Sequence, residues 1–287
     1  MGLAAVALPF ALAVIMFGLG LSLTVSDFRR VAAYPKAAII ALTCQILLLP
    51  ALCLGLILLF DLPPVLAVGM MLLAASPGGT SANLYSHLFG GDVALNISLT
   101  AINSVISVVT LPLIANLSVG FFGAQASGLG LQLDKTLQVV AIVLVPVVLG
   151  MLVKARRNAF AERMGKPVKI ASAVILVLVI LGAVWQERAN IGTYLAEVGL
   201  ITLLFSVLSL TVGYWAPRLA GVEREQAIAS CMEIGIHNST LAITVASYVL
   251  VNTQMAIPAA TYGILMFFTA AVAGFLLRAR AQRPALR

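Results

Sequence analysis

Residues 75–83 read Ala-Ser-Pro-Gly-Gly-Thr-Ser-Ala-Asn and interrupt an otherwise apolar segment that covers about 64–89. Pro77 lacks the backbone N–H that a helix needs, and Gly78 and Gly79 lower helix stability, so a continuous helix is not expected here. In a lipid bilayer, the backbone groups freed by such a break must face protein or a water-filled cavity. The pattern therefore predicts a broken transmembrane helix whose break lies at an internal polar site.

A second polar interruption reads Glu-Ile-Gly-Ile-His-Asn-Ser-Thr at 233–240, inside an apolar segment that covers about 223–250. Interrupted segments at corresponding places in two halves of a chain are typical of the binding sites of secondary transporters. Glu233 follows Arg224 by about nine residues, or roughly 14 Å of helix, so its carboxylate is predicted to lie near the middle of the membrane. A carboxylate there costs roughly 2.5–3.5 kcal/mol on insertion scales. We therefore expect Glu233 to bind a cation or a proton, or to face a water-filled cavity.

The composition of the 287-residue chain is that of a helical membrane protein. Hydrophobic residues make up 62% of it and charged residues 9%, whereas a soluble domain carries roughly 25% charged residues. The net charge of +7 would suit a nucleic-acid partner in a soluble protein, but orientation in the lipid bilayer explains it more simply here. Neither a nucleic acid nor an obligate protein partner is indicated.

Nine apolar segments are predicted to cross the membrane as helices, at about 3–25, 34–60, 64–89, 92–118, 132–154, 167–187, 192–217, 223–250 and 256–278. If the spans alternate in direction, every Lys and Arg except Lys135 and Arg188 lies on one side. The positive-inside rule then places the N-terminus outside and the C-terminus in the cytoplasm. Short connections and the lack of an evident signal peptide fit a multi-pass protein of a bacterial inner membrane.

The two broken segments stand five positions apart in this order, so they enter the membrane from opposite sides. Each is followed by a further long apolar segment, which predicts an inverted-topology repeat of the kind found in transporters. The second unit, at 132–278, has five segments and the first has four. The first unit therefore lacks a counterpart of the segment at 132–154.

Polar side chains in three further places mark candidate ligands. One helix face is predicted to carry Asn96, Thr100, Asn103 and Ser107. The oxygens of Asn96 and Thr100 suit a hard cation such as sodium. Gln45 is alone in an apolar run and is either a clamp between helices or a ligand. His237 follows Glu233 by four residues; an intact helix would bring the two together, although a break need not, and a membrane histidine can relay protons.

The chain resembles the bile acid:sodium symporter family in two motifs, Pro77-Gly-Gly-Thr-Ser-Ala-Asn83 with Gly91-Asp-Val-Ala-Leu95, and Glu233-Ile-Gly-Ile-His-Asn238. The resemblance covers nearly the whole chain and implies an all-α membrane fold in which two broken helices cross at the membrane midplane. It also implies a core domain at about 34–118 and 192–278, and a panel domain at about 3–25 and 132–187. The chain matches the family's nine-helix form, which lacks the first helix of many bacterial members.

The resemblance further implies residue roles, carried over here by position. A first sodium site would use Ala82, Asn83, Asn96, Thr100 and Glu233. A second would use Gln45, Glu233, His237 and the backbone carbonyls of Ile234 and Ile236. An organic anion would meet the half-helix ends at Gly79, Thr80, Ser81, Asn238 and Ser239, where N-terminal helix dipoles favour negative charge.

Three departures from the family pattern affect these sites. Ala82 stands where Ser is usual, so only its carbonyl could bind an ion, and Asn96 stands where Ser is common. His237 stands where Gln is usual, and a neutral imidazole nitrogen is a poor sodium ligand compared with an amide oxygen. We expect either a weakened second sodium site or its replacement by proton coupling through His237.

The sequence therefore predicts a sodium-coupled transporter that imports an organic anion, such as a bile acid, pantoate or another small carboxylate, by alternating access. A proton-coupled or sodium-independent efflux carrier of related fold is the alternative. An intramembrane enzyme would need a nucleophile or a metal cluster beside Glu233 and His237, and the sequence shows no pattern for either.

Overall fold

The computed structural model describes residues 31–79, 81–123, 133–164 and 191–281, with scattered positions between 13 and 26 and between 167 and 174. The predicted spans at 3–25 and 167–187 therefore fall largely outside the described residues, as does Thr80. Every regular element in the described ranges is helical, as the composition predicts. Four of the described helices are long and apolar enough to cross a membrane: Pro35–Leu59, Val93–Phe121, Ala196–Leu219 and Gln254–Arg278.

The described helices follow the predicted segments closely. In chain order they are η1 (Val31–Ala33), α3 (Pro35–Thr43), η2 (Cys44–Leu48), α4 (Leu49–Leu59), α5 (Pro64–Ala75), α6 (Ser81–Leu88), α7 (Val93–Phe121), α8 (Leu133–Arg156), α10 (Ile191–Leu219), α11 (Arg224–Gly235), α12 (Ser239–Thr244), η4 (Val245–Val249), η5 (Gln254–Ala256) and α13 (Ile257–Ala281). Both predicted breaks are confirmed, because α5 and α6 are separate helices, and so are α11 and α12.

Each break has a local cause in the sequence. α5 ends at Ala75, where Ser76 turns to an extended conformation, with ψ of 145°, before Pro77. The Ser76 hydroxyl donates to the Leu73 carbonyl over 2.7 Å and so satisfies one of the last acceptors of α5. α11 ends at Gly235, and the Asn238 side chain begins α12 by accepting from the Leu241 N–H over 3.1 Å.

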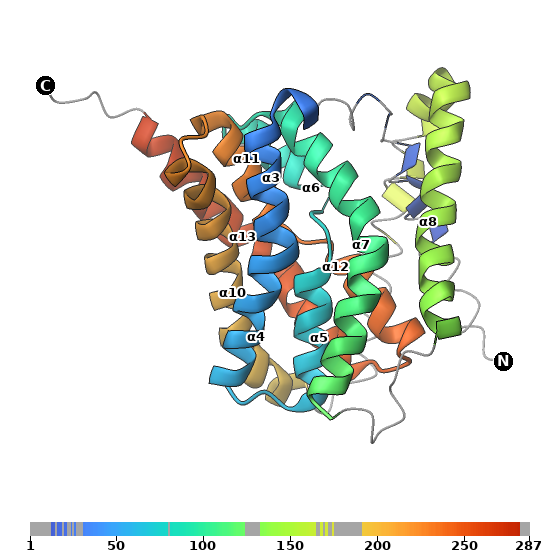
Figure 1. Ribbon diagram of the computed structural model, residues 1–287, viewed down its shortest axis with the longest axis vertical. Coiled ribbons are helices and arrows are strands. Elements are labelled where there is room, and N and C mark those ends of the chain that lie inside the picture. The colour runs from blue at the N-terminus through green and yellow to red at the C-terminus, as the bar shows by residue number, and fades with distance from the viewer. Residues whose placement is uncertain are drawn as a thin grey trace, which may run out of the picture.

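The two extended segments pair with each other in the middle of the bundle (Figure 1). The Gly79 N–H donates to the Ile236 carbonyl over 2.6 Å, and the Asn238 N–H donates to the Pro77 carbonyl over 2.8 Å. The pattern is reciprocal: each segment offers one carbonyl and, two residues later, one N–H. We call residues 76–79 and 236–238 together the crossing. Its backbone bonds replace those that the broken helices lose.

The starts of α3 and α11 and the end of α13 lie at one end of the bundle, at the top of Figure 1, and these segments carry basic residues. Arg224 at the start of α11 donates to the Leu277 carbonyl near the end of α13 over 2.9 Å. Lys36 of α3 lies beside Gly221, in the turn that precedes α11. The loop before α7 reaches the same place, because the Asp92 N–H donates to the Glu225 carbonyl over 2.9 Å. This basic end brings together charges on which the predicted orientation depends.

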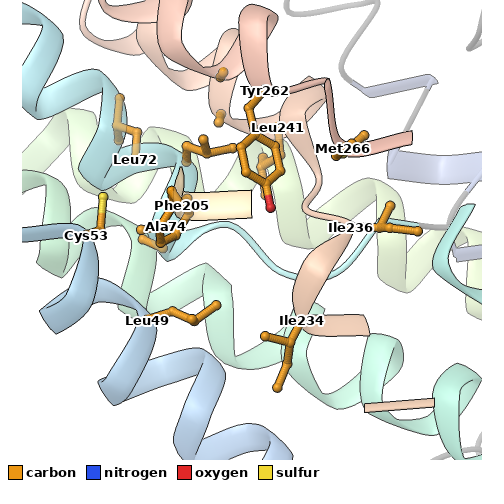
Figure 2. Close-up of a cluster of buried hydrophobic side chains, with 14 of the residues drawn as sticks. Leu49, Cys53, Leu72, Ala74, Phe205, Ile234, Ile236, Leu241, Tyr262 and Met266 are labelled. Atoms are coloured by element: carbon orange, nitrogen blue, oxygen red, sulfur yellow. The ribbon is translucent and has the colours of Figure 1, made fainter. Parts of the chain in front are cut away.

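An apolar core surrounds the crossing. Phe205 of α10 and Tyr262 of α13 are fully buried with Ile234 and Ile236 of the second break, and Figure 2 shows these side chains gathered around the two extended segments. Burying one large apolar side chain contributes about 1.5–3 kcal/mol. The Tyr262 hydroxyl also donates to the Gly235 carbonyl over 2.9 Å, so α13 holds the end of α11 in place.

Candidate functional site

Glu233 lies at the crossing and is only 2% exposed. Its Oε2 accepts a hydrogen bond of 2.5 Å from the Thr100 hydroxyl of α7. Thr100 also lies 3.0 Å from the carbonyl of Asn96, but its single proton makes the shorter contact with the carboxylate. The other oxygen of Glu233, Oε1, has no hydrogen-bond partner among the described residues.

Gly78 provides the space in which this carboxylate lies. A Cβ on Gly78 would overlap both carboxylate oxygens and the carboxyl carbon of Glu233. The sequence suggested only that Gly78 weakens the helix. Gly78 also allows close approach, because the backbone of the first break packs directly against the Glu233 side chain of the second break.

Three buried oxygens on α6, α7 and α11 lack a donor among the described residues. They are Oε1 of Glu233, Oδ1 of Asn83 on α6 and Oδ1 of Asn96 on α7. The Asn96 amide group donates to the Ala229 carbonyl over 2.7 Å, one helical turn before Glu233. A buried polar atom without a partner costs about 1–3 kcal/mol, and such atoms are few in native proteins. Three acceptors without donors on three elements match the oxygen ligands that a hard cation requires.

The residues expected at a first sodium site thus lie on α6, α7 and α11. Ala82 is fully buried at the start of α6 and can offer only a carbonyl. No group of three His, Cys, Asp or Glu side chains comes together anywhere in the described part of the chain. The chemistry of this position is therefore that of neutral oxygens around a single carboxylate, which suits a monovalent cation better than zinc or a dinuclear centre.

Gln45 and His237 meet elsewhere, at Ser76. The Gln45 amide nitrogen donates to the Ser76 carbonyl over 2.9 Å, and Nδ1 of His237 lies 3.3 Å from the same oxygen. The two side chains are themselves 3.4 Å apart. Because α11 ends at Gly235, the break separates His237 from Glu233. His237 bonds to the Gln45 region, whereas Glu233 bonds to α7. The sequence left two roles open for Gln45, a clamp between helices or a ligand, and this contact favours the clamp.

The residues expected to meet an organic anion lie where α6 and α12 begin. Gly79 bonds across the crossing, and the Asn238 side chain is engaged as the cap of α12. Ser81 and Ser239 are the first residues of the two half-helices, and Ser239 is 6% exposed. Each half-helix thus begins within two residues of the crossing, while Thr80 lies outside the described residues.

Sequence reasoning missed two hydroxyls, those of Ser86 and Ser230. Both are fully buried and have no hydrogen-bond partner in the described structure. Other buried serines, such as Ser98, bond to a carbonyl of their own helix. Spacing could have found them, because Ser86 follows Asn83 by three residues and Ser230 precedes Glu233 by three, which places each on the face of an expected ligand. The Asn103 amide nitrogen is a further buried donor without a partner.

Comparison with known proteins agrees with this geometry. The family model described as "Sodium Bile acid symporter family" matches residues 9–194. A chloroplast protein of Arabidopsis thaliana, named as the probable sodium/metabolite cotransporter BASS1, is 30% identical over 88% of this chain and 62% of its own length. A Bacillus subtilis protein, named as the uncharacterized sodium-dependent transporter YocS, is 26% identical over 82% of this chain and 72% of its own length.

The human ileal sodium/bile acid cotransporter is 24% identical over 83% of this chain and 68% of its own length. The chain spans about 60% of the length of the plant relatives that it matches. These relatives are named as transporters and not as enzymes. With its apolar helices, this chain is an integral membrane protein that belongs to the sodium bile acid symporter family.

Proposed function

We propose that this protein is a secondary active transporter that imports an organic anion together with sodium. The observation that carries the proposal is the Glu233 cluster, defined as Glu233, Thr100, Asn96 and Asn83. In this cluster, one carboxylate oxygen of Glu233 and the amide oxygens of Asn83 and Asn96 have no donor among the described residues, and Glu233 lies beside the paired segments of the crossing. The family and the names of the relatives support the same conclusion.

The proposed cycle begins with sodium at Glu233. The cation supplies the positive charge that balances the carboxylate, and it strengthens the crossing. The organic anion then binds beside it at the half-helix ends, where Gly79, Ser81 and Ser239 lie and where Thr80 is expected, and alternating access follows. The membrane potential contributes roughly 2.3 kcal/mol per charge per 100 mV to inward sodium movement.

A core and a panel that move against each other are part of this proposal. The reciprocal bonds of the crossing support an inverted repeat of α5–α6 and α11–α12. Close packing supports a panel made of the N-terminal segment and α8, because a Cβ on Gly150 of α8 would lie 2.8 Å from the Cα of Gly20. The basic end would face the cytoplasm, with the N-terminus outside and a bacterial inner membrane as the location.

The substrate is to be found by a thermal-shift screen. The purified protein would be heated with bile acids, pantoate and other small carboxylates and sulfonates, each in sodium and in choline buffer. The transported class is expected to raise the melting temperature in sodium only, since ligands that bind the folded state stabilise it. Stabilisation that is equal in choline would favour the sodium-independent carrier.

Thr100→Val is expected to weaken sodium binding without unfolding the protein. The change keeps the shape of the side chain but removes the donor that holds Oε2 of Glu233. A hydrogen bond to a charged group contributes about 1.5–3 kcal/mol, so the sodium concentration for half-maximal uptake should rise roughly tenfold or more. Thr110→Val on the same helix is the matched control, because among the described residues the Thr110 hydroxyl bonds to the Ile106 carbonyl of its own helix. Equal effects of the two changes would contradict the role given to Thr100.

A further inference from the structure

We propose that this protein couples transport to a single sodium ion, held by the Glu233 cluster, and that Gln45, Ser76 and His237 form a latch that holds no cation. The proposal rests on the function proposed above and concerns its stoichiometry. We call these three residues the Gln45 latch. The observation behind it is that, among the described residues, buried oxygens without partners outnumber buried nitrogens without partners around Glu233, three against the one of Asn103, whereas the latch leaves one of each.

At the Glu233 cluster, the atoms without partners are oxygens. Oε1 of Glu233 and the Oδ1 atoms of Asn83 and Asn96 accept no hydrogen bond in the described structure. The amide nitrogen of Asn96 already donates to the Ala229 carbonyl, which fixes its Oδ1 as the free atom. The neighbouring Asn103 amide nitrogen is a neutral donor and does not balance the carboxylate charge, so the cluster lacks one positive partner that a single cation would supply.

At the Gln45 latch, nitrogen atoms lie where a cation would need oxygen ligands. The amide nitrogen of Gln45 donates to the Ser76 carbonyl at 2.9 Å, and Nδ1 of His237 lies 3.3 Å from the same oxygen. With no cation between them, reversing the Gln45 amide would bring two oxygens to that short distance, so the nitrogen faces Ser76 in this structure. The remaining partnerless atoms are one oxygen, Oε1 of Gln45, and one nitrogen, Nε2 of His237. A hard cation needs several oxygens, and the latch side chains leave one.

Two backbone carbonyls near the latch already accept hydrogen bonds. The Ile236 carbonyl, which the family resemblance assigned to the second sodium, accepts from the Gly79 N–H over 2.6 Å. The neighbouring Gly235 carbonyl accepts from the Tyr262 hydroxyl over 2.9 Å. Each carbonyl keeps a second lone pair, but a sodium ion here would compete with the hydrogen bond that each already accepts, and one of these bonds holds the crossing together.

Aromatic rings enclose the imidazole. The Phe205 ring stacks on His237 with centroids 5.5 Å apart and planes 28° apart. The Tyr262 ring meets it edge to face at 5.2 Å. With His237 only 1% exposed, these rings leave little room for the water molecules that could complete a sodium coordination shell. Figure 2 shows Phe205 and Tyr262 in the buried apolar cluster that also contains Ile234 and Ile236.

The helix that carries Gln45 is shaped for this contact. Residues Cys44–Leu48 form one turn of π-helix between α3 and α4, and such turns are frequent at functional positions because they shift one side chain out of the α-helical register. Gln45 is 3% exposed. The latch therefore ties α3–α4 to the crossing through neutral hydrogen bonds, where a second sodium would otherwise do so.

Radioactive sodium binding to the purified full-length chain in detergent tests the proposal, by counting the saturable sites per chain. We expect one site with a Hill coefficient close to one. Glu233→Gln should remove it. His237→Gln restores an oxygen ligand and should add a second, weaker site, so that the Hill coefficient rises above one. His87→Gln is the matched control, because His87 is exposed on α6 away from the crossing, and it should leave the count at one.

Each other outcome has a distinct meaning. Two sites in the natural chain would overturn the single-sodium proposal and leave the proposed function intact. No saturable site in the natural chain would overturn the proposed function together with this inference. A count that stays at one in a monodisperse His237→Gln protein would refute the role given to the imidazole.

Discussion

Glu233→Gln is expected to abolish sodium-dependent uptake of the substrate in proteoliposomes. The change keeps the size of the side chain but removes the only charge in the Glu233 cluster. Leaving one partner of a buried ion pair alone costs about 3–5 kcal/mol, which corresponds to a loss in sodium affinity of roughly a hundredfold or more. Glu233→Ala should have the same effect.

Two observations separate this result from simple misfolding. Without sodium, the Glu233→Gln protein should melt at the same temperature as the natural chain or higher, because it no longer buries an uncompensated charge. Glu197→Gln makes the same chemical change at an exposed position of α10 and should leave uptake unchanged. Sodium-driven uptake that survives Glu233→Gln would disprove the site assignment.

Gly78→Ala is expected to be nearly as damaging, by a different route. The added Cβ would overlap the Glu233 carboxylate, so either the carboxylate leaves Thr100 or the paired segments of the crossing separate. Overpacking of a tight interior costs about 1–3 kcal/mol, and sodium affinity should fall with stability. Melting temperature and sodium-dependent uptake measure the two effects.

The matched control is Gly55→Ala on α4, where an added Cβ meets nothing within 4 Å. Alanine should leave uptake unchanged there and stabilise the helix by up to about 1 kcal/mol. Combining Gly78→Ala with Glu233→Asp, whose side chain is one methylene shorter, should restore part of the lost stability. If Gly78→Ala behaved like Gly55→Ala, the close approach of Gly78 to Glu233 would not matter for transport.

Local chemistry made the two breaks predictable. Pro77 and its glycines cannot continue a helix, and α5 does end at Ala75 before them. Glu233 was predicted to be functional because a lone carboxylate in an apolar run needs a partner, and it lies buried at the crossing. Features of this kind depend on one short segment, so the sequence alone carries them.

Contacts between distant segments were not predictable in the same way. The pairing of Gly79 with Ile236 depends on how two helices meet, which neither segment encodes by itself. Spacing alone could not separate His237 from Glu233, because the point at which α11 ends decides it. The sequence could not decide between the two roles of Gln45 for the same reason, since its partner, Ser76, is 31 residues away in the chain.

The most direct test of the central claim is a sodium titration of the melting temperature, with choline to keep ionic strength constant. An ion that binds only the folded protein stabilises it by about 2.7 kcal/mol at a hundred times its dissociation constant. We predict that sodium raises the melting temperature of the natural chain in a saturable way and does not change that of Glu233→Gln. The absence of a shift in the natural chain, or an equal shift in the variant, would contradict a sodium site at Glu233.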